Sequence, residues 1–185
     1  NIDVIIIGAG IAGITTAYYL QKNFPDIRYK ILDSRSSAGG TWDQMKFPGV
    51  RADNDMYTYG FSFNPWNGSI IGKGSDIRDY INQTAEKFKI KKNIMFNTQV
   101  SELSWKDSQW TTKTDNKNYT SQYVICCTGS RDRDNPHQPK FKGENKYKGK
   151  IVHTQAWGDT DYKGKTVTII GSGCTAITMA PSIIK

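Results

Sequence analysis

Short runs of apolar, β-branched residues recur along the chain and predict strands. These runs cover residues 3–8, 29–33, 94–100, 123–129 and 166–171. The first run, DVIIIG, does not alternate apolar with polar positions, which is typical of a strand buried on both faces of a sheet. Residues 100–120 do alternate, and this pattern predicts a small antiparallel meander.

Between the strands, apolar residues at helical spacing predict three helices. They cover residues 11–23, residues 76–88 with Ser75 as the N-cap, and the stretch that begins at Cys174. Residues 39–65 predict a long loop, and the polar residues 131–149 predict a linker. This order of elements predicts an α/β fold. We expect a Rossmann-like, three-layer domain with a parallel sheet and the meander, followed by the start of a second Rossmann domain.

The turn GAGIAG joins the first predicted strand to the first helix and has the form G-x-G-x-x-G. The first Gly permits the tight bend, the second lets the backbone approach a pyrophosphate, and the third lets the helix pack against the strand. Asp33 ends the second predicted strand, where a carboxylate accepts hydrogen bonds from a ribose. The pattern predicts a dinucleotide site; a glycine-rich turn of some other α/β protein is the alternative. The residues of this site are Gly8, Ala9, Gly10, Ile11, Ala12, Gly13 and Asp33.

A second turn, of the form G-x-G-x-x-A, follows the strand predicted at residues 166–171. Two such turns indicate two dinucleotides. FAD in the first site and a nicotinamide cofactor in the second is the economical pairing, because a flavin accepts a hydride from a nicotinamide. The charge of Asp33 repels a ribose 2′-phosphate, so the first site is not expected to bind NADP. The second turn comprises Gly171, Ser172, Gly173, Cys174, Thr175 and Ala176.

The net charge of +8 suits an anionic ligand but does not specify one. The lysines are scattered among Asn, Asp and Glu, so a solvated surface is the simpler interpretation. Nucleic-acid binding is the alternative, and it predicts salt-sensitive retention on DNA. No apolar run reaches the roughly 18 residues of a membrane helix, and no signal-peptide pattern is present. We therefore expect a soluble, cytoplasmic protein without an integral membrane span.

The three cysteines, Cys126, Cys127 and Cys174, form no C-x-x-C pair, so we expect no dithiol redox site. Cys174 is expected to be a small buried residue and not a nucleophile, because no basic partner is near it in sequence. No metal site is expected. The chain begins at Asn1 and ends at Lys185 inside a predicted helix, and we expect it to be the N-terminal fragment of a longer protein.

The stretch at residues 39–66 reads GGTWDQMKFPGVRADNDMYTYGFSFNPW. It resembles the class B flavoprotein monooxygenases, which include the Baeyer–Villiger and the flavin-containing monooxygenases. The resemblance is strongest to the branch that contains the mycobacterial ethionamide-activating monooxygenase, and it extends from Asp3 to the end of the chain. The matching positions are Gly39, Gly40, Thr41, Trp42, Asp43, Phe47, Pro48, Gly49, Asp53, Asp55, Met56, Tyr57 and Thr58.

The same family carries a fingerprint, F-x-G-x-x-x-H-x-x-x-W followed by Pro or Asp, between its two dinucleotide sites. The chain resembles it at Gly149, His153 and Trp157, with Tyr147 in place of Phe and Gly158 in place of Pro or Asp. Trp157 favours the Baeyer–Villiger type, because the flavin-containing monooxygenase subgroup has Tyr or Phe there. The resemblance implies that His153 acts in the linker that couples two domains; an ordinary core histidine is the alternative.

The resemblance implies three segments: the N-terminal part of an FAD-binding domain at 1–145, an interdomain linker at 146–163, and the start of an NADP-binding domain at 164–185. It implies an enzyme, an FAD- and NADPH-dependent monooxygenase that inserts one oxygen atom of O2 into a ketone through a C4a-peroxyflavin. The alternatives are N- or S-oxygenation of an amine or sulfide, as in N,N-dimethylaniline monooxygenases, and a degenerate, non-catalytic flavoprotein. The fragment alone is not expected to turn over.

The resemblance also assigns roles to single residues. Asp53 is the implied catalytic residue: it would lie near the isoalloxazine ring and orient an Arg located beyond Lys185, with a turn-capping Asp as the alternative. The aromatic residues between 57 and 66 either line the cavity or pack in the core. The implied cofactor-binding residues outside the two glycine-rich turns are Asp33, Ser34, Arg35, Gly40, Thr41, Trp42, Asp43, Gln44, Arg51, Ala52, Asp53, Tyr59, Val100, Thr128 and Gly129.

Overall fold

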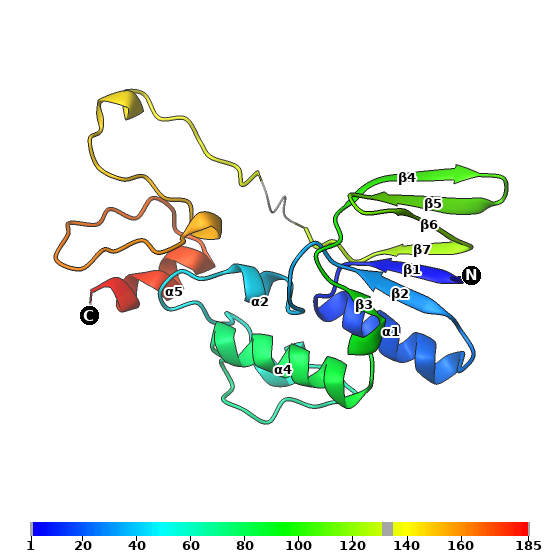
Figure 1. The fold of residues 1–185 in the computed structure, drawn as a ribbon. Helices are drawn as coiled ribbons and strands as arrows, with labels where there is room; N and C mark the ends of the chain where they lie inside the picture. The colour runs from blue at the N-terminus through cyan, green and yellow to red at the C-terminus, as the bar shows by residue number, and fades with distance from the viewer. Residues whose placement is uncertain (1, 131–134, 185) are drawn as a thin grey trace.

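Four of the predicted strands form a parallel sheet with the order β3-β2-β1-β7 (Figure 1). The structure, a computed structural model, describes residues 2–130 and 135–184. Strand β1 has a partner on both edges, and its residues Ile5 and Ile6 are fully buried, which explains why its apolar run is continuous. The strands are β1 (Val4–Ile7), β2 (Tyr29–Leu32), β3 (Ile94–Met95) and β7 (Tyr123–Cys126).

Two helices pack on one face of this sheet. Their apolar side chains join Ile6 and Ile31 of the sheet in one buried cluster, to which the first helix contributes Ile14 and the second contributes Ile77 and Ile81. The helices are α1 (Ile11–Asn23) and α4 (Gly74–Lys87). Both agree with the predicted helices to within two residues, because each repeats its apolar positions over three turns or more.

The meander covers the opposite face of the sheet (Figure 1). Tyr119 of the meander packs against Ile5 and Leu32, and this second buried cluster joins the two sheets. Helices, parallel sheet and meander thus form three layers, and the predicted α/β fold is confirmed. The strands of the meander are β4 (Val100–Lys106), β5 (Gln109–Thr114) and β6 (Asn118–Ser121), in the order β4-β5-β6.

The strand predicted at residues 94–100 is shorter than expected. Only β3 pairs with β2, and the chain then leaves the sheet at Asn97, which adopts a left-handed conformation with φ of +52°. The N–H groups of Asn97 and Thr98 donate to the carbonyls of Arg35 and Asp33, respectively. These bonds carry the chain across the end of β2 and into the meander.

The long loop predicted at residues 39–65 contains two one-turn helices. They are α2 (Thr41–Gln44) and α3 (Met56–Tyr59). Four residues are too few to show a hydrophobic period, so the sequence pattern did not reveal them. The N-cap predicted for α4 was wrong: the helix begins one residue before Ser75, its N-cap is Lys73, and the Ser75 hydroxyl donates to Asp76.

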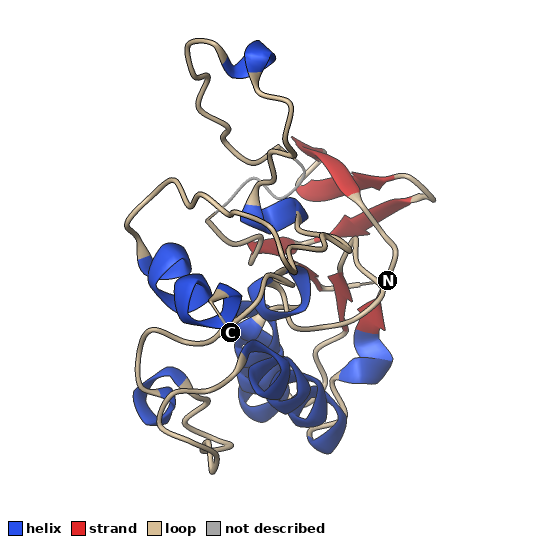
Figure 2. Ribbon diagram, turned by 90° about the vertical axis from the view of Figure 1, so that its left-hand side faces the viewer, coloured by secondary structure: helices blue, strands red, loops and turns tan. Residues whose placement is uncertain are grey.

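The C-terminal part consists of loops, two 3-10 turns and one helix, and the loop around η2 stands away from the rest of the chain in both views (Figures 1 and 2). The prediction of a strand at residues 166–171 was wrong, because these residues pair with no strand in the described part of the chain. Part of the predicted linker, residues 131–134, lies outside the described residues. The elements are η2 (Glu144–Lys146), η3 (Thr154–Ala156) and α5 (Cys174–Ile183).

Candidate functional site: a dinucleotide cavity at the ends of the parallel strands

The first glycine-rich turn is held in place by backbone contacts that leave no room for a side chain. Gly8 has φ of +106°, and an added Cβ would lie 2.3 Å from the carbonyl oxygen of Cys127. An added Cβ on Gly13 would lie 1.9 Å from the carbonyl oxygen of Gly8. The turn therefore packs tightly against β7 and α1, as expected when a helix must begin directly at the end of a strand.

A cavity of about 600 Å³ opens at the carboxyl ends of β1, β2 and β7. Its volume lies within the roughly 300–1,000 Å³ of ordinary ligand pockets, and its place at the strand ends is where open α/β sheets bind ligands. Most of the predicted cofactor-binding residues of the FAD half line this one cavity. They are Gly8, Gly10, Ile11, Ala12, Asp33, Ser34, Arg35, Gly40, Thr41, Trp42, Gln44, Tyr59, Val100, Thr128 and Gly129.

The floor of the cavity suits the diphosphate of a dinucleotide. Gly10 and Gly40 face each other so closely that an added Cβ on Gly40 would lie 3.1 Å from the Cα of Gly10. Within the described residues, α1 has no side-chain cap and no acidic residue in its first turn. Its first N–H groups and the positive end of its dipole therefore remain available to an anion. The residues present fit a dinucleotide such as FAD.

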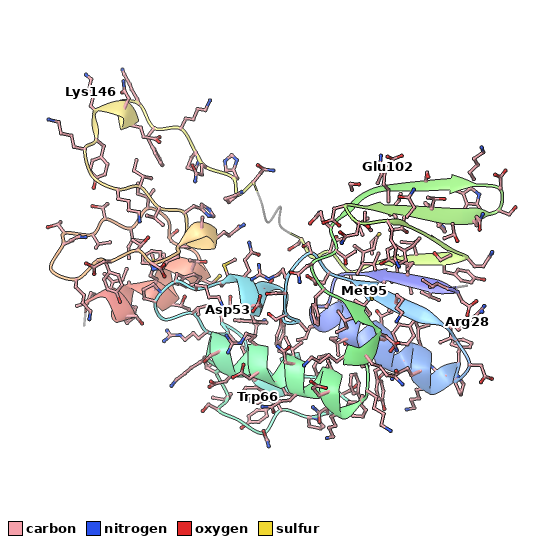
Figure 3. All side chains as sticks on the ribbon, viewed as in Figure 1. Arg28, Asp53, Trp66, Met95, Glu102 and Lys146 are labelled. Atoms are coloured by element: carbon pink, nitrogen blue, oxygen red, sulfur yellow. The ribbon has the colours of Figure 1, made fainter. Side chains whose placement is uncertain are left out.

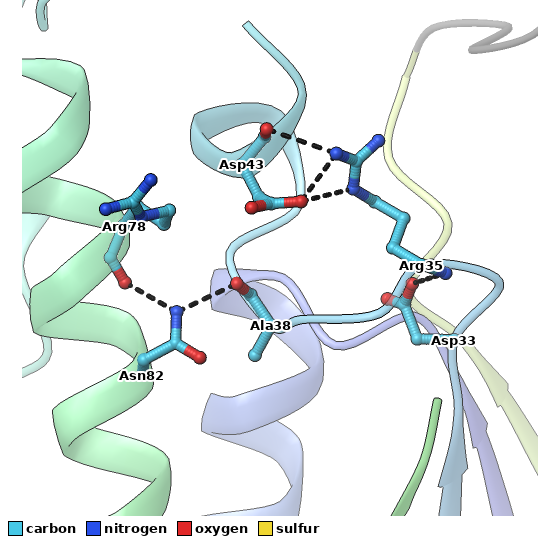
Figure 4. Close-up of polar contacts among 6 residues, drawn as sticks. All are labelled: Asp33, Arg35, Ala38, Asp43, Arg78 and Asn82. Atoms are coloured by element: carbon cyan, nitrogen blue, oxygen red, sulfur yellow. Dashed lines mark hydrogen bonds and ion pairs between the residues drawn. The ribbon is translucent and has the colours of Figure 1, made fainter. Parts of the chain in front are cut away.

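Asp33 is nearly buried at the rim of the cavity and its carboxylate is fixed by two backbone groups. The N–H of Ala9 donates to Oδ2 over 2.6 Å. The N–H of Arg35 donates to Oδ1 over 2.8 Å (Figure 4). Each carboxylate oxygen can accept more than one hydrogen bond, so both keep capacity for a ribose hydroxyl. Ala9 itself lies behind the cavity wall, where its N–H ties the glycine-rich turn to β2.

Arg35 and Asp43 form an ion pair that fastens helix α2 beside β2 (Figure 4). Nε of Arg35 donates to Oδ2 of Asp43 over 2.6 Å, and Nη2 donates to the carbonyl of Asp43 over 3.1 Å. Burial alone would raise the pKa of Asp43, but hydrogen bonds from Ser37 and Arg35 and the charges of Arg35 and Lys46 outweigh it and lower this pKa. Asp43 does not line the cavity, so its part in the site is to hold α2.

The loop segment that precedes α2 is also attached to the layer of helices. The side-chain amide of Asn82 donates to the carbonyls of Ala38 and Arg78, both over 2.9 Å (Figure 4). On the other side of α2, the indole N–H of Trp42 donates to the hydroxyl of Tyr59 over 3.1 Å. Trp42 and Tyr59 both line the cavity, and their rings meet edge to face with centroids 6.1 Å apart.

The remaining aromatic residues of the loop belong mainly to the core. Phe61 and Trp66 are buried, and Phe63 stacks on Tyr18 with ring centroids 3.7 Å apart. Tyr57 is exposed. Of the aromatic residues between 57 and 66, only Tyr59 lines the cavity, so the two-residue spacing reflects core packing for the others.

Arg51, Ala52 and Asp53 do not line the cavity, and neither does the buried Gly13. Ala52 is buried and donates its N–H to the carbonyl of Gly72, whereas Arg51 and Asp53 are exposed. Asp53 lies on the loop between α2 and α3 (Figure 3). A catalytic role for Asp53 therefore stays a prediction.

The second glycine-rich turn opens α5, but it does not reach the first cavity. Within the described residues α5 resembles α1 in having no side-chain cap and no acidic residue in its first turn. Cys174, expected to be buried, is exposed, because nothing in the described part of the chain covers the first turn of α5. The residues Gly171, Ser172, Gly173, Thr175 and Ala176 accompany it in this turn.

The fingerprint residues form a compact turn on the C-terminal part. Nδ1 of half-buried His153 accepts a hydrogen bond from the N–H of Gln155 and so caps η3. Trp157 packs against a buried cluster that includes Met179. Gly158 has φ of +55°, a left-handed conformation that Pro does not adopt, so glycine at this place suits the backbone it has here. Gly149 precedes this turn, in contact range of the Tyr147 ring.

Several cavity residues were not among the predicted cofactor-binding residues. They are Ile7, Leu32, Gly39, Met45, Thr98, Gln99, Cys126, Cys127 and Ser130. Most of them stand at the carboxyl ends of predicted strands, and this position is the signal that would have found them. Burial raises the pKa of the Cys127 thiol, so this group stays protonated near neutral pH.

In residues 2–130 and 135–184 no group of three or more His, Cys, Asp or Glu side chains is placed to hold a metal ion. No helix in those ranges is long and apolar enough to cross a membrane.

Comparisons with known proteins agree with this geometry. The family model for pyridine nucleotide-disulphide oxidoreductases matches residues 5–185. The FAD-containing monooxygenase EthA of Mycolicibacterium smegmatis is 41% identical over 193 residues, which cover 100% of this chain and 39% of that relative. The chain thus spans about two-fifths of the length of the curated relatives it matches.

Two solved structures have the same fold. An oxidized steroid monooxygenase bound to NADP has a TM-score of 0.84 and 29% identity, covering 98% of this chain and 36% of that one. OTEMO in complex with FAD and NADP has a TM-score of 0.84 and 27% identity, covering 98% of this chain and 37% of that one. The resemblance to flavoprotein monooxygenases is confirmed.

Proposed function

Because the chain belongs to the pyridine nucleotide-disulphide oxidoreductase family, we propose that it is the FAD-binding part of an NADPH-dependent flavoprotein monooxygenase of Baeyer–Villiger type. The substrate class is a ketone, and the co-substrate is O2. The observation that carries the proposal is the convergence of the implied cofactor positions, from residue 8 to residue 129, on one cavity. The relatives with FAD or monooxygenase in their names support the same activity.

Bound FAD would supply the redox chemistry that amino-acid side chains lack. The chain's own residues bind and shield it. The open N-terminus of α1 would hold the diphosphate, and the carboxylate of Asp33 would accept hydrogen bonds from the ribose. The ion pair of Arg35 with Asp43 holds α2 in place, so that Trp42 stays in the wall of the cavity.

We assign residues 1–145 to the FAD-binding domain, 146–163 to a linker and 164–185 to the start of an NADP-binding domain. The first assignment is supported by the two sheets, because both are built from strands β1 to β7. The last is supported by the second glycine-rich turn and by the uncapped N-terminus of α5 within the described residues. In this arrangement His153 and Trp157 belong to the linker, and Asp53 belongs to the loop between α2 and α3.

Isotope labelling of the full-length protein tests the proposal. The protein is supplied with NADPH, 18O2 and a cyclic ketone, or with NADPH, 18O2 and a thioether, and the products are examined by mass spectrometry. One 18O atom in a lactone is expected. A labelled sulfoxide without any lactone would assign the protein to heteroatom oxygenation instead. Bound FAD without NADPH consumption would overturn the monooxygenase proposal and leave a non-catalytic flavoprotein.

A further inference from the structure

A short segment ties the wall of the FAD cavity to the helix of the second glycine-rich turn. This strap, residues 45–50, directly follows α2, and its first residue, Met45, lines the cavity. Met45 and Phe47 of the strap form a buried cluster with Met179 of α5, each only 6% exposed. Half-buried Trp157 of the fingerprint packs against the same cluster.

The strap also touches α5 through its backbone. Gly49 has φ of +77°, and an added Cβ would lie 2.4 Å from the carbonyl oxygen of Thr178 and 2.4 Å from Oγ of Ser182. Only a residue without a side chain brings the strap this close to the helix. The contact is therefore specific to the docked arrangement of strap and helix and would be lost if either moved away.

The N-terminus of α5 lies at the proposed nicotinamide site, and the strap begins at the wall of the proposed FAD site. Met179 stands five residues after Cys174, about 8 Å along the axis of α5 at 1.5 Å per residue. An anion bound at the N-terminus of α5 fixes this helix. A fixed α5 favours the docked strap, and the docked strap holds Met45 and α2 in the position that forms the cavity wall.

We propose that the cluster of Met45, Phe47, Met179 and Trp157 is a positioning device through which a nicotinamide dinucleotide at α5 strengthens FAD binding in the first cavity. The inference rests on the proposed function, because it requires both dinucleotides. The two states are the docked and the undocked strap, and each ligand binds the docked state better. Linkage then requires that FAD strengthens nicotinamide binding by the same factor.

Binding titrations on full-length protein stripped of FAD test this coupling without any turnover. The dissociation constant of FAD is measured by quenching of flavin fluorescence, with and without saturating NADP+. In the native protein we expect NADP+ to lower this constant about tenfold, within the usual range of site-to-site coupling. In Met179→Ala the effect should fall below about twofold.

Two further variants separate coupling from general loss of packing. Met179→Leu keeps the volume of the side chain and should retain the coupling. Ile81→Ala removes a fully buried side chain from α4, outside the cluster, and should lower the melting temperature without reducing the coupling. Gly49→Ala should abolish the coupling, because its Cβ separates strap and helix.

Equal coupling in the native protein and in Met179→Ala would overturn the inference, as would the absence of any coupling in the native protein. Either result leaves the proposed function intact if the protein still incorporates labelled oxygen into its substrate. Failure to bind FAD at all would instead overturn both, so the two proposals fail in distinguishable ways.

Discussion

The unit formed by β1 and α1 and the unit that leads into α5 share an apolar run, a glycine-rich turn and a helix, but their surroundings differ. In the first unit, added Cβ atoms on Gly8 or Gly13 would collide with backbone oxygens. In the second, added Cβ atoms on Gly171 or Gly173 would meet nothing within 4 Å in the described part of the chain. The turn and the helix therefore form from local sequence, whereas the strand and the tight packing need neighbours.

The largest expected effect is a difference in stability between alanine substitutions in the two glycine-rich turns. Gly8 and Gly171 both have positive φ, so alanine costs about 1–3 kcal/mol of backbone strain at either position. Gly8→Ala adds a collision with Cys127, which raises the cost by about 1–3 kcal/mol, and it should release FAD. Melting temperature and FAD content of both full-length variants measure the difference. Equal losses in the two variants would contradict the close packing of the first turn.

Asp33 sharpens the comparison, because its carboxylate ties the first glycine-rich turn to the end of β2. Asp33→Ala removes the acceptor of two backbone N–H groups and of the ribose. FAD binding should weaken by about 1.5–3 kcal/mol, or roughly 10- to 100-fold in dissociation constant. Flavin fluorescence titration measures it. Asp26→Ala, an exposed acid in the loop before β2, is the matched control and should leave the constant unchanged.

A smaller effect is expected on the retention of FAD at acidic pH. The pKa of Asp43 is lower than its usual value of 3.8, so the carboxylate stabilises the folded site above that pH. This contribution is lost as pH falls through the lowered pKa, and FAD should then dissociate. In Asp43→Asn, retention of FAD should no longer follow this acid transition. A desalting assay for bound flavin between pH 5 and pH 2.5 distinguishes the two proteins.

Asp3→Asn is the control for that titration. Hydrogen bonds from Arg28 lower the pKa of Asp3 to about 2. Its contribution is therefore also lost in acid, below the usual pKa, but it lies at the start of β1 and far along the strand from the cavity. Retention of flavin by Asp3→Asn should follow the native curve. A shift as large as that of Asp43→Asn would mean that acid acts on the whole fold and not on α2.

The smallest effect lies at the end of α4. Lys89 has φ of +57°, and the N–H groups of Lys89 and Ile90 donate to the carbonyls of Glu86 and Ala85, respectively. Glycine is favoured at this position after a helix, so Lys89→Gly should raise stability by about 0.5–1 kcal/mol. Lys92→Gly, inside the short helix η1 (Lys91–Asn93), should not. Thermal unfolding of both variants measures the difference, and a loss of stability in Lys89→Gly would contradict the left-handed turn.

The sequence was informative where one residue type has one physical use. Glycines at a strand-to-helix turn and an acid at a strand end predicted the floor and rim of the cavity, and helical spacing predicted α1 and α4. It was uninformative where a short segment depends on distant partners. Helix α2 is held by Arg35, and the strap is held by α5, so neither has a pattern of its own. The prediction of a strand at residues 166–171 failed for the opposite reason. The apolar pattern is present, but no strand among the described residues pairs with it.

The contact of Gly8 with Cys127 also has a consequence for the order of events during synthesis. One edge of β1 is closed only by β7, which leaves the ribosome after the whole meander has been made. Until then the first strand has an unpaired edge and the glycine-rich turn lacks its backing. The hairpin of β4 and β5, whose contacts are local, can form in the meantime. A nascent chain should therefore acquire its cofactor only after residue 127 has emerged.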